Sequence, residues 1–112
     1  MAGERMRRVD EAVRQVLADA LAGELSDPRI GFITVTDVKT SPDLRAARVF
    51  VSVLGDEEAR AASLAALGSA HGLLQHRIAS QLRLKRTPTL EFVYDSTTDR
   101  ALRVESLLRE RG

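Results

Sequence analysis

The sequence predicts an α+β fold in which helices pack on one face of a three-stranded mixed sheet. An amphipathic segment opens the chain, and two β-branched segments joined by a short turn follow it. A pair of alanine- and leucine-rich helical segments then separates these two from a third β-like segment. Strands joined by a short turn pair antiparallel, whereas strands separated by helices pair in parallel through a right-handed crossover. The expected order is therefore α-β-β-α-kink-α-β-α.

The first helix is expected over residues 4–25. Its apolar residues recur at intervals of three and four, which places them on one stripe of a helix. They are Met6, Val9, Val13, Val16, Leu17, Ala20 and Leu21. Gly23 and the segment Ser26-Asp27-Pro28 end the pattern, because the residue before a proline is disfavoured in helical geometry.

Two strands are expected next, over residues 30–39 and 45–54, with a turn at residues 40–43. In the first strand Phe32 and Ile33 are adjacent, so the alternation is imperfect and predicts either a bulge or two covered faces. In the second strand the alternation is regular, and its apolar face holds Ala47, Val49, Val51 and Val53. Arg48 and Phe50 fall on the other face, where cross-strand packing and stacking on a base are both open.

Two helices and a third strand complete the expected sheet. Acidic residues at 56–58 favour a helix start, and the segment Ala70-His71-Gly72 predicts a kink before a second helix over about residues 73–84. The shared buried stripe would contain Leu64, Leu67, Leu74, Ile78 and Leu82. A strand at residues 89–95 follows Pro88, and a last helix is expected at about residues 99–109.

Composition limits the function classes. The 112 residues suit one domain, and the absence of cysteine excludes disulfides, thiolate nucleophiles and cysteine-ligated metals. No apolar run approaches the roughly 20 residues that span a bilayer, so we expect a cytoplasmic protein without membrane contact. His71 and His76 are five positions apart, too far around a helix to share a metal, and no nucleophile or phosphate-loop motif occurs. We therefore expect no enzyme activity, no cofactor and no metal.

Positive charge is concentrated even though the net charge is only +1. Between Glu58 and Glu91 the chain has five cations and no carboxylate. Three further arginines begin the first helix, where cations are unfavourable beside the positive end of the helix dipole. The predicted RNA-binding set is Arg5, Arg7, Arg8, Arg29, His71, Gly72, Arg77, Arg83, Lys85 and Arg86. Solvated helix ends would also explain the arginines and Lys85, packing or capping would explain His71, and the kink alone would explain Gly72.

Two helices that meet at a glycine-bearing turn on a three-stranded sheet resemble a type II KH domain, with Ala70-His71-Gly72 in place of the GXXG loop. A set of ordered segments resembles the ribosome-binding factor A family more specifically. These are Arg8-Val9, Asp27-Pro28-Arg29-Ile30, Val35-Thr36, Ser41-Pro42-Asp43-Leu44, Ala70-His71-Gly72 and Leu82-Arg83-Leu84-Lys85-Arg86 followed by Pro88. Members often carry arginine three residues after the kink glycine, where this chain has Gln75.

The resemblance implies a KH-like RNA-binding domain over residues 5–95 and a variable, partly frayed C-terminal helix or tail over residues 96–112. It implies a monomer that binds the free 30S subunit or its precursor and assists late processing of 16S rRNA, including the 5′ end region. Growth in the cold and functional links to assembly GTPases are further implications. A protein–protein adaptor and a general RNA-binding module remain the alternatives on the same fold.

Overall fold

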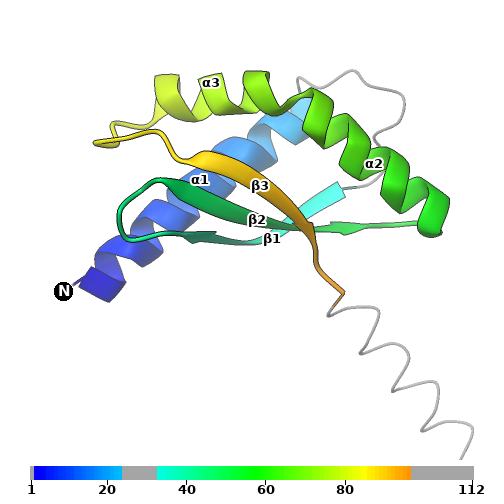
Figure 1. Ribbon diagram of the computed structural model, residues 1–112, viewed down its shortest axis with the longest axis horizontal. Coiled ribbons are helices and arrows are strands. Elements are labelled where there is room, and N and C mark those ends of the chain that lie inside the picture. The colour runs from blue at the N-terminus through cyan, green and yellow to red at the C-terminus, as the bar shows by residue number, and fades with distance from the viewer. Residues whose placement is uncertain (1, 24–32, 97–112) are drawn as a thin grey trace, which may run out of the picture.

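The computed structural model describes residues 2–23 and 33–96, which form three helices and a three-stranded sheet (Figure 1). The elements are α1 (Ala2–Gly23), β1 (Ile33–Thr40), β2 (Ala46–Val53), α2 (Glu57–Ser69), α3 (His71–Gln81) and β3 (Thr89–Tyr94). Their order and type confirm the prediction as far as β3. The expected helix at about residues 99–109 lies outside the described residues, as does Arg29.

The sheet is mixed, with strand order β1-β2-β3. β1 pairs antiparallel with β2, and β2 pairs in parallel with β3, as expected for a hairpin followed by a helical crossover. The register shifts between Val35, opposite Val51, and Asp37, opposite Phe50. Thr36 is the extra residue, so β1 contains a bulge, as the prediction allowed. The bulge is not at the adjacent pair Phe32 and Ile33 on which the prediction was based, and Phe32 lies outside the described residues.

Alternation along the strands gives the sheet one buried face and one open face. On β2 the side chains of Ala47, Val49 and Val51 are completely buried, whereas Arg48 between them is exposed. Arg48 lies 3.9 Å from Glu91 of β3 on the open face, in an exposed ion pair between the two strands. The three helices cover the buried face, and their contribution to the core is Val13, Val16, Leu17, Ala20, Ala66, Leu67, Leu74 and Ile78. Burying each such leucine or isoleucine stabilises the fold by about 1.5–3 kcal/mol.

The break between α2 and α3 is at Ala70, not at the glycine. Ala70 has φ −87° and ψ 3°, accepts the N–H of Leu74 and donates to Ala66, so a single residue turns the chain between the two helices. Gly72 lies inside α3, and a Cβ placed on it would meet no atom within 4 Å. The expectation that the kink itself requires glycine at position 72 is therefore wrong.

Helix α3 is also shorter at its C-terminal end than predicted, since it ends at Gln81 rather than at residue 84. Leu82 is extended, with φ −114° and ψ 134°. Leu82 and Leu84 both pack against the core, and two residues spaced by two reach the same side only in an extended chain. The segment 82–88, called here the connector, therefore carries Arg83, Lys85 and Arg86 outside any helix.

At the opposite end of the sheet, called here the α2 end, the charged side chains of Asp56, Arg60 and Asp95 make contacts within the fold. The carboxylate of Asp56 accepts the N–H of Ala59 at 2.8 Å and caps α2. The guanidinium of Arg60 lies 3.9 Å from the centroid of the Tyr94 ring, which joins α2 to β3. The Thr36 hydroxyl donates to Asp95 at 2.7 Å, which joins the β1 bulge to the end of β3.

Candidate nucleic-acid interface

The cations at the start of α1 are directed to solvent. The side chains of Arg5, Arg7 and Arg8 are all exposed. Arg8 lies 3.6 Å from Glu4 one turn earlier, in an ion pair of which both side chains are more than two-thirds exposed. Exposed pairs of this kind contribute about 0–1 kcal/mol to stability. The pair with Glu4 is therefore too weak to prevent Arg8 from binding a phosphate.

The second group of predicted cations is on the connector. Arg83, Lys85 and Arg86 are exposed, whereas Leu82 and Leu84 pack against the core. Because the connector is extended there, the alternation of leucine and cation directs charge outward and apolar groups toward the core. The charges are thus displayed by a segment that the core itself fixes.

Both groups lie at the same end of the molecule, where the start of α1, the β1–β2 turn and the connector meet (Figure 1). A hydrogen bond of 2.8 Å from the Thr40 N–H to the Asp10 carboxylate ties α1 to the end of β1. We call this region the basic end. It is defined by Arg5, Arg7, Arg8, Arg83, Lys85 and Arg86.

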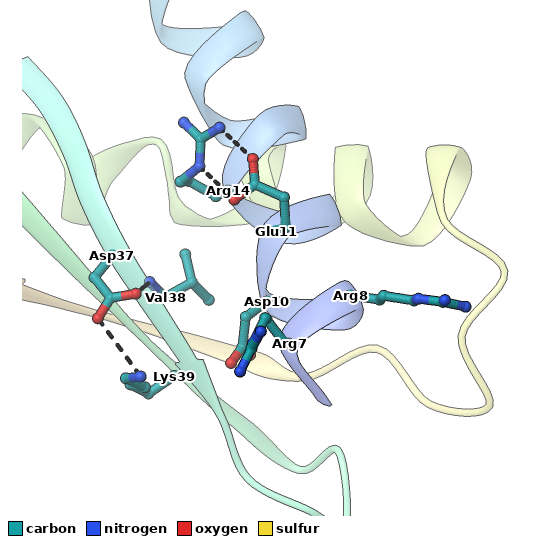
Figure 2. Close-up of a pocket in the computed structure, with 8 residues that line it drawn as sticks. All are labelled: Arg7, Arg8, Asp10, Glu11, Arg14, Asp37, Val38 and Lys39. Atoms are coloured by element: carbon teal, nitrogen blue, oxygen red, sulfur yellow. Dashed lines mark hydrogen bonds and ion pairs between the residues drawn. The ribbon is translucent and has the colours of Figure 1, made fainter. Parts of the chain in front are cut away.

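A hollow of about 370 Å³ opens between α1 and β1 at this end (Figure 2). Its wall mixes charges, with Arg7 beside Asp10, Arg14 bonded to Glu11, and Asp37 facing Lys39. The hydrogen bond from Arg14 lowers the pKa of Glu11 and raises that of the guanidinium, which keeps both groups charged. Arg8 points away from β1 in this view. The hollow is therefore largely neutralised inside, and its cations are most available at the rim.

Three other predicted residues lie along α3 and outside the basic end. His71 is half-buried, with its Nε2 atom 3.1 Å from the carbonyl oxygen of Leu90. Gly72 is exposed, and Arg77 is half-buried. The ring of His71 thus has a packing role between α3 and β3. The structure gathers six of the ten predicted residues at one end, places these three elsewhere, and does not describe Arg29.

Gln75 has a structural role that the sequence did not reveal. Its side-chain amide donates to the carbonyl oxygen of Pro88, and its Oε1 atom accepts the N–H of Leu90 at 3.1 Å. Together with His71, one helical turn earlier, it satisfies backbone groups on the outer edge of β3. His71 and Gln75 are four positions apart, so they lie on the same side of the helix. This spacing of two polar residues is the sequence feature that could have indicated their shared role.

Two exposed cations at the basic end also escaped the sequence argument. They are Lys39 and Arg45, on either side of the β1–β2 turn. Each has a nearby carboxylate in sequence, since Lys39 lies 3.7 Å from Asp37 and Arg45 lies 3.5 Å from Asp43. A search for acid-free stretches passes over cations of this kind.

The chemistry available at the basic end is the binding of anions. Within residues 2–23 and 33–96 no three histidine or acidic side chains gather in a way that would hold a metal ion. In the same part of the chain, no helix has the length and apolarity needed to cross a bilayer. Exposed guanidinium and ammonium groups carried on several segments suit the phosphates of a nucleic acid.

Comparison with known proteins gives one consistent result. The family model described as ribosome-binding factor A matches residues 5–108. The ribosome-binding factor A of Beutenbergia cavernae is 46% identical over 106 residues, which cover 95% of this chain and 67% of that protein.

Solved structures agree. The crystal structure of ribosome-binding factor A from Thermus thermophilus superposes with a TM-score of 0.71 at 30% identity, covering 80% of this chain and 94% of that one. A Thermus thermophilus homology model fitted into the cryo-EM map of a 30S–RbfA complex has a TM-score of 0.64 at 31% identity, covering 79% and 92%. The chain therefore belongs to the ribosome-binding factor A family.

Proposed function

We propose that this protein binds the free 30S ribosomal subunit, or its precursor, through the basic end and assists late maturation of 16S rRNA, including the 5′ end region. The observation that carries the proposal is the meeting of the α1 cations and the connector cations at one end of the molecule. The relative fitted into a 30S complex has the same fold, which supports the choice of particle.

The proposed mechanism is electrostatic docking on folded rRNA without catalysis. Phosphate contacts position a protein on its nucleic acid, and they release bound counterions, so affinity falls as salt rises. If about four phosphates are neutralised, the log–log slope of affinity against salt should be about −3. The protein would act as a cytoplasmic monomer, leave the subunit before translation, support growth in the cold and work beside assembly GTPases.

The testing experiment is sedimentation of the purified protein with isolated 30S, 50S and 70S particles at low and moderate salt. Co-migration with 30S alone, weakened by salt, is expected. Binding that does not change with salt would favour a protein–protein adaptor. A preference for naked single-stranded RNA over the folded subunit would favour a general RNA-binding module. Either result would refute the proposed mode of binding.

A further inference from the structure

Hydrogen bonds on both sides hold the β1–β2 turn, residues 41–45, in place. On one side the Thr40 N–H donates to Asp10 of α1 at 2.8 Å. On the other side the Thr89 N–H donates to the carbonyl oxygen of Arg45 at 2.9 Å, which joins the turn to the first residue of β3. The turn therefore keeps a fixed position between the two segments that carry the basic end.

The turn is also rigid internally. Asp43 accepts hydrogen bonds from the Ser41 hydroxyl at 2.7 Å and from the Arg45 N–H at 3.0 Å. The Ser41 hydroxyl in turn accepts the Ala46 N–H at 3.1 Å. Leu44 has φ 61°, a left-handed conformation that is unfavourable for a branched side chain and persists only where the surroundings impose it. A turn built in this way presents its side chains with little conformational freedom left to lose on binding.

Two hollows with cations in their walls lie near the turn. The first is the hollow of Figure 2, between α1 and β1, where Arg7, Arg8 and Lys39 share the wall with acidic residues. The second, of about 480 Å³, is lined by the turn residues Pro42, Asp43 and Leu44 and by Lys85 and Arg86 of the connector. The turn, called here the ridge, therefore lines one hollow and follows the strand that lines the other, and it has an exposed cation on each side, at Lys39 and Arg45.

The geometry points to the β1–β2 turn as the central contact of the RNA interface, with Lys39 and Arg45 each binding a phosphate and the tip at Pro42 entering a groove of folded RNA. This inference rests on the proposed function and adds a third segment to the two that the sequence predicted. The α1 cations and the connector cations would contact the backbone on either side of the ridge.

The chemistry of the ridge favours the backbone of folded RNA over unstacked bases. Residues 39–46 and 82–88 contain no aromatic side chain, so this end lacks the stacking platforms on which single strands are bound. The carboxylates at the ridge are already engaged, since Asp43 accepts two hydrogen bonds inside the turn and Asp37 accepts the N–H of Val38. Folded RNA presents phosphates at fixed spacing. A rigid turn with a cation on each side, Lys39 and Arg45, can bind two such phosphates at once.

The test compares three single-charge variants of the full chain for binding to isolated 30S particles across a salt series. Lys39→Gln and Arg45→Gln each remove a proposed phosphate contact. Arg48→Gln removes an equally exposed cation that lies opposite Lys39 on β2 and is paired with Glu91 of β3, so it tests whether the effect is confined to the two proposed contacts. Each turn variant should bind about three- to tenfold more weakly, with a salt slope less steep by about 1. Arg48→Gln should bind within about twofold of the wild type with the same slope.

A second measurement identifies what the ridge touches. The chain has no cysteine, so Pro42→Cys gives a single attachment site for a photoactivatable crosslinker at the tip of the turn. Leu54→Cys, at the residue directly after β2 and 73% exposed, is the matched control at the far end of the strand. On irradiation with 30S particles, the label at position 42 should crosslink to 16S rRNA and the label at position 54 should not.

The outcomes separate the two proposals. A wild-type protein that binds no 30S particle would overturn the proposed function and this inference with it. If the wild type binds and both turn variants match Arg48→Gln in affinity and slope, only the role of the turn is overturned. Crosslinking from position 42 to ribosomal proteins and not to RNA would likewise overturn the assignment of RNA to the ridge.

Discussion

The two ends of this molecule use charge differently. At the α2 end, Asp56 caps a helix, Arg60 lies on the Tyr94 ring and Asp95 accepts from Thr36, so each charge supports a contact within the fold. At the basic end, Arg8 and Arg83 are exposed, and the ion pair of Arg8 joins neighbours on the same helix surface. A cation count alone therefore does not locate a binding surface. What matters is whether the fold already uses the charge.

Charge reversal on the connector should produce the largest effect. The double variant Arg83→Glu with Lys85→Glu replaces two exposed cations by anions that repel phosphate. Affinity for 30S particles should fall at least about a hundredfold. The melting temperature should stay within about 3 °C of the wild type, because neither side chain is buried. Sedimentation and a thermal melt measure the two quantities. A large loss of stability without weaker binding per folded molecule would show that the connector cations are structural.

Removing the Gln75 side chain should destabilise the fold. Gln75→Ala leaves the carbonyl oxygen of Pro88 and the N–H of Leu90 without these partners in a half-buried place, which should cost about 1–3 kcal/mol. Gln81→Ala, at an exposed position of the same helix, is the control and should change stability by less than about 0.5 kcal/mol. Urea denaturation measures both. Equal stability of the two variants would remove the role assigned to Gln75.

A pair of arginine substitutions tests the comparison directly. Arg60→Ala removes the cation over the Tyr94 ring and should lower the free energy of unfolding by about 1–2 kcal/mol. It should leave the affinity of the folded protein for 30S unchanged. Arg7→Ala should do the reverse, with stability within about 0.5 kcal/mol and weaker binding. The contrast between the ends would collapse if both variants changed the same property.

The smallest expected effect is a pH dependence at the β1–β2 turn. The hydrogen bond from the Ser41 hydroxyl, then that from the Arg45 N–H, and the charges of Arg45 and Arg86 lower the pKa of Asp43. A carboxyl whose pKa is lower in the folded state stabilises that state above its unfolded pKa of about 3.9. The contribution is lost as pH falls through the folded pKa. The difference in unfolding free energy between wild type and Asp43→Asn should therefore be constant from about pH 7 to 5 and shrink below about pH 4. A difference that grows in acid would contradict this.

Sequence patterns predicted the layers of the fold because those layers depend on local periodicity. The alternation around Val49 and Val51 correctly predicted which face of the sheet is buried. The helical segments between β2 and β3 correctly predicted that these strands pair in parallel. The helix break lies within the predicted segment Ala70-His71-Gly72, but Ala70 and not Gly72 is the residue that leaves helical geometry. A propensity scale cannot reveal which of two neighbours the tertiary contacts will select.

The candidate site was predicted in part for a similar reason. Arg83 and Lys85 were found because no acid lies near them in sequence, and α1 was suspected because its arginines oppose the helix dipole. Lys39 and Arg45 were missed because Asp37 and Asp43 balance them locally. The contacts of Gln75 join residues 13 and 15 positions apart, and no local pattern encodes such contacts.

The parallel pairing of β2 with β3 has a consequence for the order in which the molecule folds. The β1–β2 hairpin joins residues close in sequence, whereas α2 and α3 separate β3 from its partner β2 along the chain. Contacts between distant segments close large loops and form late. We therefore expect pulse-labelling hydrogen exchange to protect the amides of β1 and β2 before those of β3. Because the Thr89 N–H bonds Arg45 and so anchors the connector to the turn, the basic end is completed only in that last step. A partly folded chain would then lack its assembled basic surface.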